Sequence, residues 1–192
     1  MERICVFAGS SEGRLTEYRH MAADLGRELA DRRIGLVYGG ASRGLMGAIA
    51  DAALEAGGEV IGVIPRALFK QEVAHSGLSR LYEVNSMHER KAKMAQLADA
   101  FIALPGGFGT FDELFEILTW AQLGIHNKPI GLLDVAEYFA PFLSLLRHAA
   151  KEGFVPHYNL ELIHYDQDPG LLVDMLLKPT PLARVVGGSD LT

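Results

Sequence analysis

Short apolar runs alternate with helical stretches along this chain of 192 residues, and that alternation restricts its fold more than any other feature. The apolar runs predict strands at 4–8, 34–38, 60–64, 81–84, 100–104 and 130–133, and a weaker strand near the end. Helices are expected up to about 32, over 45–56, from near 87, over 110–123, over 139–151 and up to 177. Strands separated by helices of this length pair in parallel through right-handed crossovers. The chain is therefore predicted to form a doubly wound, Rossmann-like α/β sheet with helices on both faces.

Length and composition predict one well-buried domain. Hydrophobic residues make up 49% of the chain and charged residues 22%, a balance typical of an ordinary soluble protein. We expect a single Rossmann-like domain over 1–178 and a short C-terminal tail over 179–192. A net charge of −6 argues against a general nucleic-acid or anionic-membrane surface, although it permits a local basic pocket for a small anion.

Targeting signals and cysteine content predict the compartment. Met1-Glu2-Arg3 leads into an apolar run without a signal-peptide layout, and no apolar stretch approaches the length of a membrane span. The single cysteine, Cys5, makes a disulfide within the chain impossible. We therefore expect a cytoplasmic protein in which Cys5 packs in the core.

A glycine-rich loop follows the strand expected at 100–104. It contains Pro105 and three glycines, Gly106, Gly107 and Gly109. A helix is expected directly after it, because four apolar residues repeat at helical spacing: Phe111, Leu114, Phe115 and Leu118. Free backbone N–H groups and the positive end of the helix dipole favour an anion at such a helix start, and glycines let the backbone approach it. The loop is predicted to bind a phosphate.

Thr110 and Glu113 permit a second interpretation of the same stretch. Their spacing fits a capping box, in which the threonine hydroxyl caps the helix and the glutamate reaches back to the cap residue. On spacing alone, this structural role for Glu113 is as well supported as a chemical one. Asp112 stands beside Glu113, and two adjacent carboxylates that face a phosphate would repel it. At least one of them is expected to point elsewhere or to serve chemistry.

Two more glycine clusters, Gly9 and Gly39-Gly40, also follow expected strands. In a doubly wound sheet, ligands bind beyond the carboxyl ends of the strands, where all three clusters fall. A tight strand-to-helix turn is the alternative for Gly39-Gly40, but three glycine turns at one edge favour a ligand pocket. None of them spells the dinucleotide fingerprint, since Asp112 stands where the third glycine belongs, and no Walker motif occurs. Bound NAD and ATP hydrolysis are therefore not expected.

A charged cluster precedes the glycine loop. Ser86 and Glu89 have capping-box spacing, which predicts a helix start near Met87. Arg90 and Lys91 then lie near the positive end of that helix, where cations are disfavoured by about 0.3–1 kcal/mol. A solvated basic face is the usual explanation for such a pair. We favour a nearby anion, because arginine grips phosphate or sugar hydroxyls with several donors and lysine adds a point charge.

Together these motifs resemble the LOG ("lonely guy") family, the cytokinin riboside 5'-monophosphate phosphoribohydrolases. The two main segments of the resemblance are Pro105-Gly106-Gly107-x-Gly109-Thr110-x-x-Glu113 and Ser86-Met87-His88-Glu89-Arg90-Lys91. It extends to the segments 5–11, 38–40 and 119–124, and covers about residues 3 to 165. Phe111-Asp112 replaces the Leu-Glu of many relatives, which is a conservative difference. Older labels call such proteins lysine decarboxylases, but the six scattered lysines of this short chain show no Schiff-base context.

The resemblance implies hydrolysis of the N-glycosidic bond of an adenosine 5'-monophosphate, which releases the free base and ribose 5-phosphate. Family members prefer bases with a substituent such as isopentenyl on the exocyclic amine. The family's catalytic positions correspond to Arg90 and Glu113, and a carboxylate near the anomeric carbon suits the positive charge that develops on the ribose. The other expected substrate-binding residues are Gly39, Gly40, Glu72, Met87, Lys91, Gly107, Phe108, Gly109, Thr110, Phe111, Asp112 and Thr119. No metal and no cofactor are implied, whereas a homodimer with its active site near the subunit interface is.

Two other functions fit the same sequence. A non-catalytic nucleotide-binding or carrier module would use the same sheet edge, because a fold alone does not decide function. A general salvage enzyme that acts on plain AMP is the second alternative. The pairing of Arg90 with Glu113 favours an enzyme over a carrier.

Overall fold

A computed structural model describes residues 1–67 and 74–178, and within them it contains one seven-stranded sheet whose neighbouring strands are all parallel. The strands are β1 (Arg3–Phe7), β2 (Gly35–Tyr38), β3 (Val60–Pro65), β4 (Arg80–Val84), β5 (Ala100–Ala103), β6 (Ile130–Leu133) and β7 (Ile163–Asp166). Their spatial order is β4-β3-β2-β1-β5-β6-β7. The predicted α/β sheet is confirmed, while the tail expected over 179–192 lies outside the described residues.

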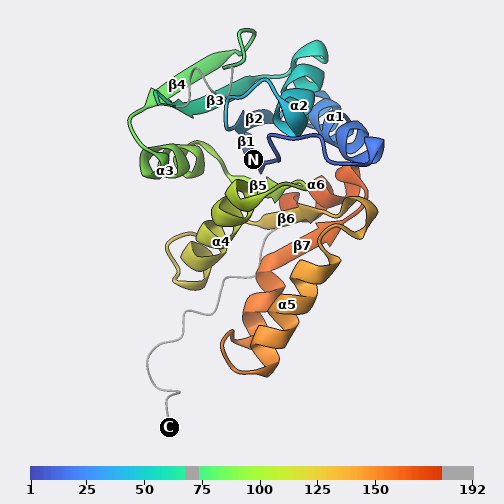
Figure 1. Cartoon of the computed structure of the whole chain (residues 1–192), viewed down its shortest axis with the longest axis vertical. Coiled ribbons are helices and arrows are strands. Elements are labelled where there is room, and N and C mark those ends of the chain that lie inside the picture. Colours follow the sequence, from blue (N-terminus) through green and yellow to red (C-terminus); the bar gives the residue numbers. More distant parts are fainter. Residues whose placement is uncertain (68–73, 179–192) are drawn as a thin grey trace.

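Helices cover both faces of this sheet (Figure 1). The helices of the described ranges are α1 (Thr16–Asp31), α2 (Gly44–Glu55), α3 (Met87–Leu97), α4 (Phe108–Gln122), α5 (Ala140–Lys151) and α6 (Pro169–Leu177). Two short 3-10 helices, Val135–Glu137 and His157–Leu162, flank α5 in the sequence. One hydrophobic core contains side chains of α1, α2 and α6, and the other contains side chains of α3, α4 and α5. The helices on both faces were therefore predicted correctly.

The central strand β1 shows how one short run supplies both cores. Ile4 and Val6 belong to the core beneath α1 and α2, whereas Cys5 and Phe7 belong to the core beneath α3 and α4. Successive strand residues point to opposite faces of a sheet, so a strand that is covered on both sides is apolar throughout. Burial raises the pKa of the Cys5 thiol well above its usual value, and the nearby Glu113 carboxylate adds to this rise. The expected packing role of Cys5 is confirmed.

The direction of chain progression changes between β1 and β5. From β1 the chain builds outward to β4 at one edge, and from β5 it builds outward to β7 at the other. The loops that leave β1 and β5 therefore diverge, which opens a crevice where ligands bind in sheets of this type. The two loops are tied together, because the Gly9 N–H donates to the Pro105 carbonyl at 3.1 Å. The predicted phosphate loop lies at this switch point.

Helix α4 begins two residues earlier than predicted. Gly107 occupies the N-cap position without a side-chain cap, and Thr110 is a buried residue in the first turn. The proposed capping box of Thr110 and Glu113 is therefore wrong. The early start depends on Gly106, since a Cβ at this position would lie 2.1 Å from the Thr110 hydroxyl oxygen. The buried side of α4 consists of Thr110, Glu113, Leu114, Ile117 and Ala121, so the predicted apolar face is rotated and Phe115 is exposed.

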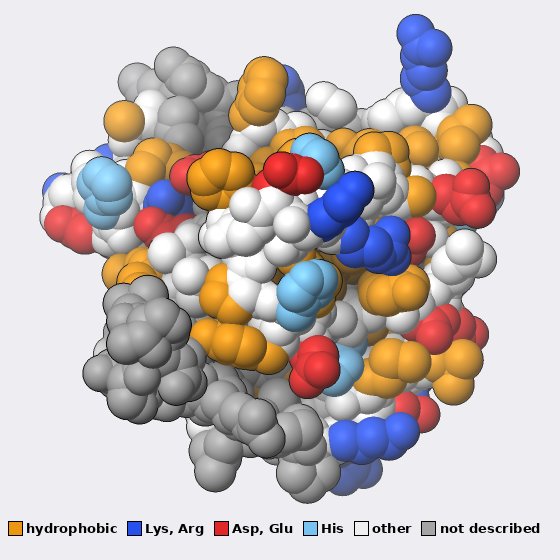
Figure 2. Space-filling view, turned by 90° about the horizontal axis from the view of Figure 1, so that it is seen from below, with side chains coloured by type: hydrophobic (Ala, Val, Ile, Leu, Met, Phe, Trp, Pro, Cys, Tyr) orange, Lys and Arg blue, Asp and Glu red, His pale blue; other side chains and the backbone are white. Residues whose placement is uncertain are grey.

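The surface carries charges of both signs. On the face shown in Figure 2, acidic, basic and hydrophobic side chains are interspersed over the described residues. No helix within these residues is long and apolar enough to cross a membrane.

Candidate active site

Two neighbouring hollows lie at the switch point, where they share Gly9, Ser10 and Gly107. The first, here called the charged hollow, has about 630 Å³ of empty space including its open mouth. Its lining consists of Ala8, Gly9, Ser10, Met46, Met87, Arg90, Gly107, Phe108, Gly109, Thr110 and Glu113. The second, here called the tyrosine hollow, has about 600 Å³ and is lined by Gly9–Gly13, Tyr18, Leu45, Pro105–Gly107 and Tyr138.

Gly107 and Gly109 border the charged hollow and leave it open. A Cβ built on either residue would meet no other atom within 4 Å. Among the described residues, the Gly107 N–H has no hydrogen-bond partner. The first N–H groups of a helix lack partners within the helix, and α4 directs its positive end toward the same space. This end of the hollow is suited to a phosphate group.

Arg90 reaches the charged hollow from the first turn of α3. That helix begins as predicted, because the Ser86 hydroxyl accepts from the Glu89 N–H at 3.1 Å. The Glu89 carboxylate reaches back to the N–H of Asn85, one residue before the cap. The capping-box prediction is therefore confirmed with a small shift of its second bond. It fixes the start of the helix and so the direction in which Arg90 projects.

The guanidinium of Arg90 is buried but only partly paired. The residue is 5% exposed, and its Nη2 donates to the Gly39 carbonyl at 3.4 Å. Its Nη1 lies 3.8 Å from the sulfur of Met87, and its Nε has no partner in the described part of the structure. A Cβ on Gly39 would lie 2.0 Å from Nη2, so only glycine leaves room for this side chain. The Gly39-Gly40 turn thus contributes to the site by seating Arg90.

Glu113 faces Arg90 from α4. Its Oε1 lies 4.0 Å from the Arg90 Nη2, and the residue is 8% exposed. A carboxylate and a guanidinium that share a hollow at this separation can both contact one ligand placed between them. The pair combines an anionic group that can stabilise positive charge with a multi-donor cation.

Lys91 does not line either hollow. Its Nζ lies 3.0 Å from Asp112 Oδ2 and 3.1 Å from Glu116 Oε1, so it joins α3 to α4. Burial alone would lower the pKa of Lys91, but the hydrogen bonds to the two carboxylates outweigh burial and raise the pKa. Asp112 is largely exposed and turns toward Lys91, as expected if only one of the two adjacent carboxylates serves the site.

Four other predicted binding residues lie outside both linings or outside the described residues. Thr119 is exposed, and its hydroxyl donates to the Phe115 carbonyl at 2.7 Å. The ring of Phe111 stacks against Tyr138. Gly40 adopts a φ of +82° and accepts a backbone bond from residue 75. Glu72 falls in the segment 68–73, which the structure does not describe.

The side chains at the hollows that the sequence did not predict as site residues include Met46, Tyr18 and Tyr138. Met46 lies in the first turn of α2. Its backbone N–H donates to the Gly9 carbonyl, which holds the start of α2 against the loop after β1. Tyr138 follows β6, so its place next to the β5 loop becomes predictable only once the order of the strands is known. Ser10 was part of a recognised motif and lines both hollows.

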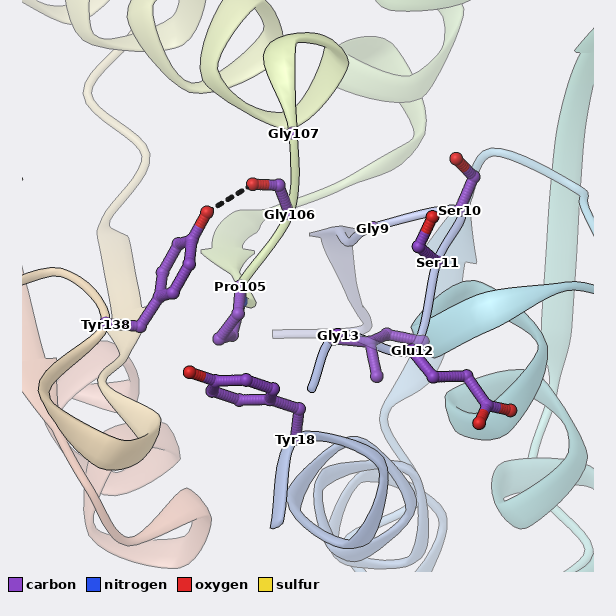
Figure 3. A pocket seen from close by; sticks show the side chains of 11 residues that line it. Gly9, Ser10, Ser11, Glu12, Gly13, Tyr18, Pro105, Gly106, Gly107 and Tyr138 are labelled. Carbon is purple, nitrogen blue, oxygen red and sulfur yellow. Dashed lines mark hydrogen bonds between the residues drawn. The ribbon is translucent and has the colours of Figure 1, made fainter. Parts of the chain in front are cut away.

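The tyrosine hollow lies beside the glycine loop (Figure 3). The rings of Tyr18 and Tyr138 meet edge to face, with centroids 6.0 Å apart. The Tyr138 hydroxyl donates to the Gly106 carbonyl. In Figure 3, Tyr138 stands on one side of the loop, and Ser10 and Ser11 stand on the other.

No lysine or histidine of the part of the chain that the structure describes lines either hollow. Within residues 1–67 and 74–178, no group of three or more His, Cys, Asp or Glu side chains is placed to hold a metal ion.

Comparison with known proteins gives a family match and close relatives. A family described as "Possible lysine decarboxylase" matches residues 46–176. The chain is 54% identical over 153 residues to the cytokinin riboside 5'-monophosphate phosphoribohydrolase LOG of Oryza sativa subsp. japonica, covering 80% of this chain and 63% of that protein. It is 54% identical over 153 residues to a cytokinin riboside 5'-monophosphate phosphoribohydrolase of Rhodococcoides fascians, covering 79% of this chain and 77% of that protein.

Solved structures share the architecture at lower identity. The molybdenum cofactor carrier protein of Chlamydomonas reinhardtii superposes with a TM-score of 0.67 at 24% identity, covering 91% of this chain and 95% of that chain. The molybdenum cofactor binding protein of Rippkaea orientalis superposes with a TM-score of 0.67 at 20% identity, covering 91% of this chain and 94% of that chain. At these identities the likeness shows the fold alone.

Proposed function

This chain belongs to the LOG family, the cytokinin riboside 5'-monophosphate phosphoribohydrolases, and on this premise we propose that it hydrolyses the N-glycosidic bond of N6-substituted adenosine 5'-monophosphates. The products are the free base and ribose 5-phosphate. The lysine decarboxylase description of the matching family is a poor guide to this activity, because no lysine of the described residues lines either hollow.

One observation carries the proposal: Arg90 and Glu113 face each other at 4.0 Å beside the start of α4. The open backbone at Gly107 and Gly109 suits the phosphate, while the two charged side chains suit the ribose. The thioethers of Met46 and Met87 offer an apolar, adaptable surface to the base. The phosphate, the ribose and the base of the substrate would thus each contact groups of suitable chemistry.

The proposed reaction is a displacement at the anomeric carbon. The bond from C1' to the base nitrogen breaks, its electron pair leaves with the base, and positive charge develops on the ribose ring. Glu113, acting as a carboxylate, stabilises this charge and orients the water that adds to C1'. Water supplies the hydroxyl of ribose 5-phosphate, and its proton ends on the departing base. Arg90 holds the nucleotide through its phosphate or ribose oxygens.

Residues around the catalytic pair complete the proposed site. Thr110 completes the phosphate loop with the backbone of Gly107 to Gly109. Lys91 and Asp112 act through α3 and α4, because they hold together the two helices that carry the catalytic pair. Glu72 is proposed as a ribose or base contact on the strength of the family resemblance.

We further propose that the protein is a cytoplasmic homodimer whose interface borders the charged hollow. Phe108 is 95% exposed at the rim of that hollow, and Phe115, Leu123 and Ile125 are exposed along α4 and the turn after it. Such side chains favour a protein partner over water. Light scattering coupled to size exclusion tests the dimer: a monomer at micromolar concentration contradicts it. Cell fractionation with an antibody tests the compartment, and recovery outside the cytosol contradicts it.

The activity is tested by incubating the protein with isopentenyl-AMP, with AMP and with the two matching nucleosides, and by following free base and ribose 5-phosphate. We expect cleavage of the monophosphates and little cleavage of the nucleosides. Faster cleavage of isopentenyl-AMP than of AMP supports the hormone-precursor substrate, and the reverse order indicates salvage. Binding without release of base, by folded protein, identifies a carrier and contradicts the proposal.

A further inference from the structure

We propose that Tyr138 is a positioning residue that sets the direction of the phosphate-binding amide of Gly107. The Tyr138 hydroxyl donates to the Gly106 carbonyl from the side of the tyrosine hollow (Figure 3). No described peptide bond is cis. In a trans peptide, the carbonyl of one residue and the N–H of the next point in opposite directions. Fixing the Gly106 carbonyl toward Tyr138 therefore directs the Gly107 N–H away from it, toward the side where Gly9 and Ser10 stand.

That side is where the two hollows meet, because Gly9, Ser10 and Gly107 line both of them. The Gly107 N–H has no partner there among the described residues. An anion at this point would accept from the Gly107 amide, from the first turn of α4 and from the Ser10 hydroxyl.

The Gly106–Gly107 peptide needs such an anchor. A peptide between two glycines has little steric resistance to rotation, because neither neighbour has a Cβ. Gly106 cannot be replaced to stiffen the loop, since Thr110 occupies the place of its side chain. The hydrogen bond from Tyr138 thus restricts the rotation of the Gly106–Gly107 peptide, which the two glycines themselves do not restrict.

Tyr138 itself is held on several sides. Its ring stacks on Phe111 with an interplanar angle of 6°, and it meets Phe139 edge to face at 5.2 Å. The two residues before it, Ala136 and Glu137, have φ values of 51° and 58°. Left-handed backbone at two successive non-glycine residues is strained and persists where surrounding structure requires it. Here the strained turn places Tyr138 next to the glycine loop after β5.

The role rests on the proposed function, since it concerns the phosphate of that substrate. Titration calorimetry of Tyr138→Phe with ribose 5-phosphate, and separately with adenine, tests it without relying on turnover. The ring and its packing remain in this variant, and only the hydroxyl is lost. We expect the Kd for ribose 5-phosphate to rise about five- to tenfold and the Kd for adenine to stay unchanged. Tyr18→Phe is the matched control, because it removes from the same hollow a hydroxyl that has no hydrogen-bond partner among the described residues.

An unchanged Kd for ribose 5-phosphate in Tyr138→Phe overturns the inference, and so does an equal weakening of both ligands, which would indicate general distortion. Turnover of the wild-type protein separates the two proposals. Cleavage by the wild type with no Kd change in the variant leaves the function standing without this role. If the wild type cleaves nothing but Tyr138→Phe selectively weakens binding of ribose 5-phosphate, the role of Tyr138 stands and the proposed function does not.

Discussion

Arg90 and Lys91 are neighbours on α3, yet they meet α4 in two different ways. Lys91 forms an outer cluster with Asp112 and Glu116, in which one ammonium contacts two carboxylates at 3.0 and 3.1 Å. Arg90 and Glu113 form an inner pair at 4.0 Å, and within residues 1–67 and 74–178 the Arg90 Nε lacks a hydrogen-bond partner. A buried donor without a partner costs about 1–3 kcal/mol.

The difference distinguishes charges that are paired within the protein from charges that are proposed to contact the substrate. The outer cluster satisfies its charges within the protein and joins two helices. The inner pair keeps donor capacity in reserve beside an open hollow, as expected of groups that complete their bonding with a ligand. The following changes test that distinction.

Glu113→Gln has the largest expected effect. The amide keeps the shape of the side chain but cannot stabilise positive charge on the ribose, so kcat should fall by about 10² to 10³. Turnover of isopentenyl-AMP, with circular dichroism to establish folding, measures it. Glu116→Gln is the matched control in the outer cluster, where we expect kcat within about threefold of wild type because such pairs are weak. A folded Glu113→Gln protein with near wild-type turnover would remove Glu113 from the mechanism.

Gly39→Ala disturbs the inner pair by displacing the guanidinium of Arg90. Its Cβ would lie 2.0 Å from the Arg90 Nη2 and 3.0 Å from the Met46 sulfur, so the guanidinium must move. We expect kcat/KM to fall about 10- to 100-fold, because displacements near 1 Å at a catalytic group have costs of this order. Steady-state kinetics check the loss, and wild-type kinetics in this variant would show that the seat of Arg90 is unimportant.

Gly107→Ala tests whether the open space belongs to the substrate. A methyl group there meets no protein atom, and the φ of −99° is accessible to alanine. The variant should therefore be as stable as wild type or more stable by about 0.4–1 kcal/mol. In contrast, KM for the nucleotide should rise about tenfold, because the methyl occupies space next to the phosphate. An unchanged KM with normal thermal unfolding would place the phosphate elsewhere.

Lys91→Met has the smallest expected effect, because it breaks only the outer cluster. Loss of the two ion pairs should lower the free energy of unfolding by about 1 kcal/mol. We expect kcat/KM to fall about threefold through a looser fit between α3 and α4. Denaturant unfolding and steady-state kinetics measure the two effects. A rise in KM of more than tenfold with little loss of stability would instead make Lys91 a direct substrate ligand.

Local patterns were sufficient to predict the sheet, the helix start near Ser86 and the glycine turn at Gly106 to Gly109 that follows β5. Strand and helix periodicities, caps and glycine turns depend on the residues of short segments, so these features can be predicted from the sequence of each segment. The alternating order of elements then implies parallel pairing, and parallel pairing brings the loops after β1, β2 and β5 to one edge.

Only the tertiary structure decided which charges enter the site. Asp112 and Glu113 are adjacent in the sequence, and the packing of α4 on the sheet buries one and exposes the other. The same packing rotated the predicted apolar face. The capping box that the spacing of Thr110 and Glu113 permitted does not form, because the helix begins two residues earlier, where Gly106 leaves room for Thr110. Tyr138 lies 32 positions from Gly106 and carries no local signal for its contact. Its role depends on a strand order and a strained turn, which arise from contacts between distant segments.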